Sequence, residues 1–72
     1  MTTITFTEHG YLQEEDWHNV ITAAISIRKE IVEGGGMATK SLVENRLMNV
    51  FDGLDRYNAH SVMNHIEYHN LR

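Results

Sequence analysis

The longest periodic run of apolar residues in the sequence predicts a helix over residues 12–33. At about 100° per residue, these apolar residues gather on one side and cover roughly half of the helix circumference. Three acidic residues at its start, Glu14, Glu15 and Asp16, suit the positive end of the helix dipole, and three glycines follow its end. An apolar face this wide needs neighbours on two sides, so we expect the other elements to pack around this helix. The expected core or homodimer contacts on it are Trp17, Ile21, Ala24, Ile27 and Ile31.

Arg28 interrupts this apolar face near its middle. Three interpretations are open. The side chain can lie along a neighbouring element and extend its guanidinium group to water. It can pair inside the protein with a carboxylate such as Asp52 or Asp55. It can also anchor an interface, because arginine is enriched among the residues that dominate binding energy.

Residues 1–11 are expected to form a short β-strand or an extended arm, because apolar and polar residues alternate from Thr2 to Thr7. Ile4 and Phe6 are the apolar positions, and we expect them to dock this segment on the helices. No second strand pattern follows in the sequence, so the backbone of this segment needs another partner. It can pair with its own copy across a two-fold axis, extend the sheet edge of another protein, or lie along the helices.

A second helix is predicted over residues 41–57 and a third over residues 59–71. Ser41 and Glu44 match a capping box at the start of the second helix, and Asn58 can end that helix and cap the next. The fold class is therefore mainly α: a single domain with a short N-terminal strand or arm followed by three helices packed around the first. The expected apolar faces consist of Val43, Leu47, Val50, Phe51 and Leu54 in the second helix and of Ala59, Val62, Met63 and Ile66 in the third.

The small size of the chain favours self-association. A chain of 72 residues buries only about 60% of its unfolded surface, so its stability is marginal without reinforcement. The sequence has no cysteine, which removes disulfides and thiolate metal ligands as reinforcements. We therefore expect a homo-oligomer, most simply a dimer.

The formal net charge of −4 argues against nucleic acid as a partner, because such binding takes most of its affinity from lysine and arginine. An acidic surface instead suits a partner protein with a basic groove. No basic and apolar leader and no apolar run of membrane-spanning length is present in the sequence. We expect a soluble, cytoplasmic protein with no membrane partner.

Five histidines in so short a chain raise the question of a metal site. His65 and His69 are four residues apart, the spacing at which two imidazoles on one helix face can share an ion. Glu67 faces away from them, so the metalloprotease pattern is absent. A zinc site would need further ligands. We therefore expect no metal and no other cofactor, and interpret the two histidines as packing against Tyr68.

The sequence predicts a small non-enzymatic protein–protein interaction module that acts as a regulator, adaptor or inhibitor. Ser61 precedes His65 by one helical turn, but no oxyanion-binding loop is implied, and so small a chain has little room to exclude water from a reacting centre. One concrete form of inhibition is to block a basic or nucleic-acid-binding surface of a partner. The candidate partner-binding residues are Glu14, Glu15, Asp16, Arg28, Tyr57 and Tyr68.

Two alternative functions come from other classes. A strand followed by helices is the outline of a dimeric ribbon–helix–helix transcriptional regulator, and the second and third helices could form a helix-turn-helix around Gly53. The scattered basic residues and the acidic start of the first helix oppose DNA binding. A histidine-based metal-binding protein is the other alternative, with His65 and His69 as candidate ligands and further ligands from His9, His18, an aspartate or a second chain.

Overall fold

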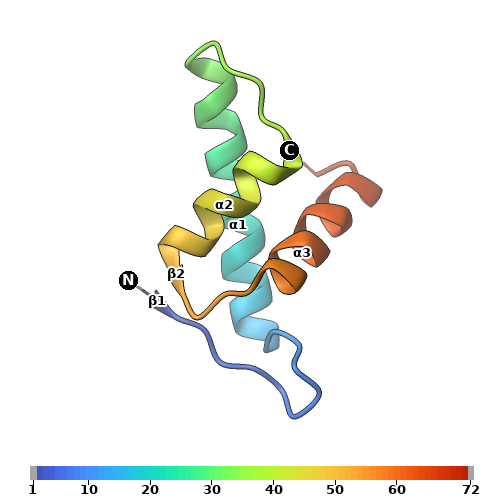
Figure 1. Cartoon of the computed structure of the whole chain (residues 1–72). Coiled ribbons are helices and arrows are strands. Elements are labelled where there is room, and N and C mark those ends of the chain that lie inside the picture. Colours follow the sequence, from blue (N-terminus) through green and yellow to red (C-terminus); the bar gives the residue numbers. More distant parts are fainter. Residues whose placement is uncertain (1, 72) are drawn as a thin grey trace.

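Three helices make up most of the computed structural model, which describes residues 2–71, with Thr2 and Thr3 described by their backbone alone (Figure 1). The elements in chain order are β1 (Thr2–Thr3), α1 (Glu14–Glu33), α2 (Lys40–Val50), β2 (Phe51–Asp52) and α3 (Arg56–Tyr68). The longest helix, α1, lies behind the other two, and α2 and α3 both pack on it and on each other. The radius of gyration of 11.6 Å is close to the roughly 11 Å of a compact chain of this length. The prediction of a mainly helical fold with three helices is confirmed.

The core lies where the three helices meet. Its largest fully buried side chains are Leu47, Ile66, Val20, Val43 and Val62. Of the residues expected on the apolar face of α1, Ala24 and Ile31 are buried, whereas Trp17, Ile21 and Ile27 are only half-buried against the core. The helix therefore uses the centre of its apolar arc for the core and leaves the flanks of the arc partly uncovered.

Glycine ends α1 as its sequence predicts. Gly35 has a φ of 86°, which an L side chain rarely adopts. The N–H of Gly36 donates to the carbonyl of Ile31 and that of Gly35 to the carbonyl of Val32, both at 3.0 Å. These two bonds form a Schellman motif, which satisfies carbonyl groups that the helix itself leaves free. The start of α1 falls at Glu14 instead of residue 12, because Leu12 forms an antiparallel bridge with Phe6.

The cap of α2 differs from the predicted capping box. The helix begins at Lys40, and Thr39, not Ser41, is its N-cap: the Thr39 hydroxyl accepts a hydrogen bond from the Leu42 N–H at 3.2 Å. Two hydroxyl residues so close together both fit the sequence signal for a cap. Glu44 is too far along the helix to return to Thr39, and it is buried toward α3 instead.

The cap assignment is testable with a matched pair of variants. Thr39→Ala should lower the free energy of unfolding by about 1 kcal/mol, because the first turn of α2 loses an acceptor for one of its free N–H groups. Ser41→Ala, which removes an exposed hydroxyl inside the same turn, should change it by less than about 0.5 kcal/mol. Urea denaturation of both variants measures the difference. Equal effects would show that Ser41 shares the capping role.

The second helix is shorter than predicted. It ends at Val50, not at residue 57, and Phe51–Asp52 is extended and pairs in parallel with Thr2–Thr3. The ladder continues with the Ile4 N–H donating to the Asp52 carbonyl at 3.0 Å. Gly53, with a φ of 87°, turns the chain after this strand. Val50, expected on the buried face, is the last residue of α2 and is 45% exposed.

The strand partner that the sequence pattern did not show therefore lies within the chain. The pairing is limited to two residues on each strand, whereas the alternating pattern extends over residues 2–7. Ile4 is buried in the core and Phe6 is 37% exposed. The side chain of Thr3 lies outside what the structure describes.

The sequence predicted Asn58 as the boundary between the second and third helices, but Asn58 lies within α3. This helix begins at Arg56 after Asp55, and Asn58 is buried in its first turn. The Asn58 side-chain amide donates to the Gly10 carbonyl at 3.1 Å and to the Asp55 carboxylate at 2.7 Å. An amide can satisfy several polar groups at once, so Asn58 fastens the loop before α1 to the start of α3.

The third helix ends at Tyr68 instead of residue 71. Asn70 has a φ of 52°, and asparagine is one of the few side chains that tolerate this left-handed conformation. The Leu71 N–H donates to the Ile66 carbonyl at 2.9 Å, which closes the helix end as glycine does in α1. The C-terminal segment consequently turns back toward α1 and the loop before α2 (Figure 1).

Candidate interaction surface

An open groove of about 650 Å³ runs along the C-terminal half of α1. Its apolar lining comes from the flank of the α1 arc, because Ile25 and Val32 lie roughly 120° to 140° around the helix from the buried Val20. Val32 is 58% exposed, and Met37, in the loop that borders the groove, is 82% exposed. The lining residues are Ile25, Arg28, Lys29, Val32, Glu33 and Ala38. Exposed aliphatic side chains around a concave surface are typical of a binding surface.

Arg28 lines this groove and also binds the C-terminal segment. Its Nη2 donates to the backbone carbonyl of Leu71 at 2.5 Å in a partly buried setting. In the described part of the chain its hydrogen bond goes to this carbonyl and not to Asp52 or Asp55, the two carboxylates considered as its internal partners. A guanidinium group has five N–H donors, and the remaining donors can serve a molecule in the groove.

The rim of the groove carries one charge of each sign. Lys29 and Glu33 are exposed and four residues apart on α1. Within residues 2–71, neither takes part in an ion pair. A lysine that precedes a glutamate by four residues is the less favourable order for pairing along one helix. Both charges are therefore available to a second molecule.

Of the three acidic residues at the start of α1, one binds another part of the chain and two are exposed. Asp16 accepts hydrogen bonds from the backbone N–H of Thr5 at 3.1 Å and from its hydroxyl at 3.2 Å. This carboxylate fastens the N-terminal segment to α1. Glu14 and Glu15 are exposed, so two of the three predicted acidic residues are accessible at the end of α1 that lies far from the groove.

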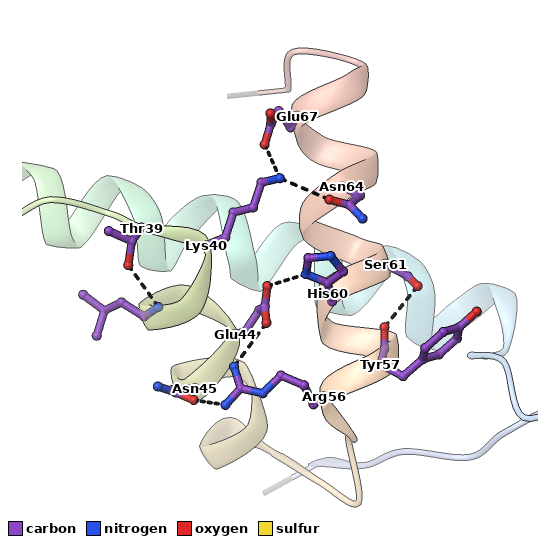
Figure 2. A network of polar contacts seen from close by, with 11 residues as sticks. Thr39, Lys40, Glu44, Asn45, Arg56, Tyr57, His60, Ser61, Asn64 and Glu67 are labelled. Carbon is purple, nitrogen blue, oxygen red and sulfur yellow. Dashed lines mark hydrogen bonds and ion pairs between the residues drawn. The ribbon is translucent and has the colours of Figure 1, made fainter.

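The sequence did not predict the buried carboxylate of Glu44 between α2 and α3. Figure 2 shows Arg56 and His60 of α3 pointing toward Glu44 of α2. Arg56 Nη1 donates to Glu44 Oε1 at 3.2 Å, and His60 Nδ1 lies 3.0 Å from Oε2. Arg56 Nη2 also donates to the Asn45 side-chain oxygen. The Glu44 side chain is only 5% exposed. The four-residue spacing of Arg56 and His60 was the available signal, because it places both on one face of a helix.

A second polar contact joins the other ends of these helices. Lys40 Nζ lies 2.7 Å from Glu67 Oε2 and donates to Asn64 Oδ1 at 3.2 Å (Figure 2). With Arg56, this makes two basic residues that are engaged with carboxylates of the same chain. Each such contact lowers the positive charge available to a phosphate backbone.

The two tyrosines expected to bind a partner lie at opposite ends of α3. Tyr57 is in its first turn and Tyr68 is its last residue, and both are exposed. The Tyr57 carbonyl accepts a hydrogen bond from the Ser61 hydroxyl at 3.1 Å (Figure 2). The structure does not gather Arg28, the acidic residues and the two tyrosines into one surface.

Aromatic rings cluster at the C-terminal end of α3. The ring centroids of His65 and His69 are 4.5 Å apart, and the Trp17 ring meets His65 edge-on at 5.2 Å. Tyr68 meets His69 at 5.0 Å. The contact with Tyr68 was expected, whereas the contact with Trp17 depends on how α1 and α3 pack. In the described part of the chain, no three histidine, aspartate or glutamate side chains gather closely enough to hold a metal ion together.

No protein-family model, curated protein or solved structure matches the chain. Over residues 2–71, none of the helices combines the length and the apolar composition that crossing a membrane requires.

Proposed function

We propose that the protein is a small, non-enzymatic protein–protein interaction module that self-associates through the groove on α1. The observation that carries this proposal is an apolar groove, with Ile25 and the exposed Val32 in its lining. Beside it lie Lys29 and Glu33, and neither is in an ion pair with the residues that the structure describes. The occupant that we propose is a second copy of the chain. A chain this small gains stability by association more than a larger domain does.

The charges on the rim favour a symmetric pair. In a two-fold interface each surface meets its own copy. If residue i of one subunit faces residue j of the other, then residue j of the first also faces residue i of the second. If two α1 helices cross in antiparallel orientation near Ile31, Lys29 faces Glu33 of the partner subunit. The same axis gives a second, identical ion pair and places the two Val32 side chains near the centre.

The surface area that a stable dimer must bury determines which parts of each copy lie in the interface. A stable interface takes about 800 Å² from each partner, about a sixth of the 4832 Å² surface of the chain. The groove alone is smaller than this. The C-terminal halves of both α1 helices and the exposed Met37 must therefore lie within the interface.

The proposed role is that of a regulator, adaptor or inhibitor, with a protein that carries a basic surface as its partner. Glu14 and Glu15 stay exposed when the groove is occupied, because they lie at the other end of α1. Each copy adds a formal charge of −4, so a dimer presents two acidic ends to a basic groove. Lys40 and Arg56 are engaged in ion pairs, which favours a protein over a nucleic acid as the partner.

Reversing the charges on the rim tests the groove. Lys29→Glu and Glu33→Lys should each weaken the dimer by about tenfold or more, because each places like charges opposite one another across the two-fold axis. The double variant, with both reversals, should restore the affinity, because every pair is again opposite in sign. Sedimentation equilibrium at low salt measures the dimer dissociation constant.

A wild-type chain that stays monomeric at high concentration would overturn the proposal. So would single reversals that leave the dimer intact. Both residues are exposed, so circular dichroism should show unchanged helix content in all three variants. Glu15→Lys is the matched control for Glu33→Lys. It makes the same change of charge at a position of α1 far from the groove, and it should leave the dimer unaffected.

A further inference from the structure

We propose that His65 and His69 form a binding site for one divalent late transition-metal ion, with Cu²⁺ bound more tightly than Zn²⁺. The two imidazole centroids are 4.5 Å apart, and the ring planes are inclined by 52°. The His69 N–H still donates to the His65 carbonyl at 3.0 Å. The backbone therefore holds both residues in helical register, one turn apart on the same face.

The distance between the rings suits chelation. A metal–nitrogen distance of about 2.0 to 2.1 Å and a near-right angle at the ion place two ligating nitrogens about 3 Å apart. Two rings at this centroid distance reach that arrangement by rotation about their side-chain bonds. His69 is exposed and His65 half-buried, so an ion can approach from solvent without opening the core.

The local field favours a cation at this position. His65 lies in the last turn of α3 and His69 directly follows its last residue, where the carbonyl ends of the peptide groups give the helix its negative pole. On α2, Lys40 is paired with Glu67, and on α1 the guanidinium group of Arg28 donates to the Leu71 carbonyl. The chain also has a net charge of −4, which adds attraction at low ionic strength.

The ligand set determines which ion binds. Neutral imidazole nitrogens suit copper, nickel and zinc, and affinity for such a site rises through the first-row series to a maximum at Cu²⁺. Structural zinc sites use four protein ligands. Within residues 2–71 no third ligand gathers beside the pair, so water would occupy the remaining positions and the ion would exchange readily. This site is independent of the groove on α1.

Trp17 provides the reporter for the test. It is the only tryptophan in the chain, and its ring touches that of His65. Titration of the full chain with Cu²⁺ near neutral pH should quench its fluorescence in a saturable way with one ion per chain. His69→Ala should weaken this binding by about tenfold or more, because two linked ligands hold one ion far better than one does. Lowering the pH should release the ion, because protons compete for the imidazoles.

The control is His18→Ala, which removes an exposed imidazole next to Trp17 in the sequence and should leave the titration unchanged. His69 is exposed, so His69→Ala should retain its helix content by circular dichroism. Quenching that does not saturate would overturn the proposal. Quenching that survives His69→Ala but disappears in His18→Ala would overturn it as well, because the ion would then sit on α1.

Discussion

Leu47→Ala should lower the free energy of unfolding by about 3 to 5 kcal/mol, the cost of emptying a fully buried leucine site. Leu47 is completely inaccessible to solvent and lies on α2, which packs against both other helices. A chain of 72 residues has a total stability of about 4 to 11 kcal/mol. The variant should therefore lose about a quarter or more of that stability, and its Tm should fall by more than about 12 °C.

Val50→Ala is the matched control for this prediction. Both residues belong to the apolar set predicted for the second helix, but Val50 is 45% exposed. Its truncation should change the free energy of unfolding by less than about 0.5 kcal/mol. Urea denaturation, with the slope m compared between variants, measures both effects. If Val50→Ala were as costly as Leu47→Ala, α2 would continue past Val50 as the sequence pattern suggested.

Glu44→Gln should lower the free energy of unfolding by about 2 kcal/mol. The replacement keeps the shape of the side chain but removes the charge that strengthens its contacts with Arg56 and His60, and hydrogen bonds to charged groups are worth about 1.5 to 3 kcal/mol. Arg56 and His60 are both about half exposed. They regain contact with water in the variant, so the loss stays below the cost of leaving a charge buried and unpaired.

Glu67→Gln tests whether burial or distance sets this cost. The Lys40–Glu67 pair is shorter, at 2.7 Å, but the side chain of Glu67 is 67% exposed. An exposed ion pair contributes about 0 to 1 kcal/mol and is screened by salt. Thermal unfolding of both variants at low and high salt should show the larger effect for Glu44. Equal losses of stability would mean that burial does not strengthen the contacts of Glu44 with Arg56 and His60.

The sequence predicted α1 well because its signals are local. A helical period maintained over the whole segment and a run of glycines at its end act within a few residues. The end of α2 was not predictable in this way. Phe51 and Leu54 are both buried, as a continuous helix would have them, but they reach the core from an extended strand and from the turn at Gly53. Periodicity cannot distinguish these two routes to burial.

One part of the candidate site could be predicted from the sequence and another part could not. The excess width of the α1 apolar face is visible in the sequence, and the groove at Ile25 and Val32 follows from it. The role of Glu44 is not visible, because its partners are 12 and 16 residues further along the chain. A local capping pattern was the stronger signal at that position. Only the packing of α2 against α3 shows that the carboxylate faces another helix.

The pairing of Thr2 with Phe51 also affects how the protein acquires its fold during synthesis. The ribosome makes the chain from its N-terminus, so the first strand appears long before the residues that complete its ladder. Contacts between α2 and α3 close a short loop, whereas this ladder joins residues that are 49 positions apart in the sequence and forms late. β1 must therefore remain solvated until Phe51 and Asp52 have been made, and its threonines suit that interval better than a run of aliphatic residues would.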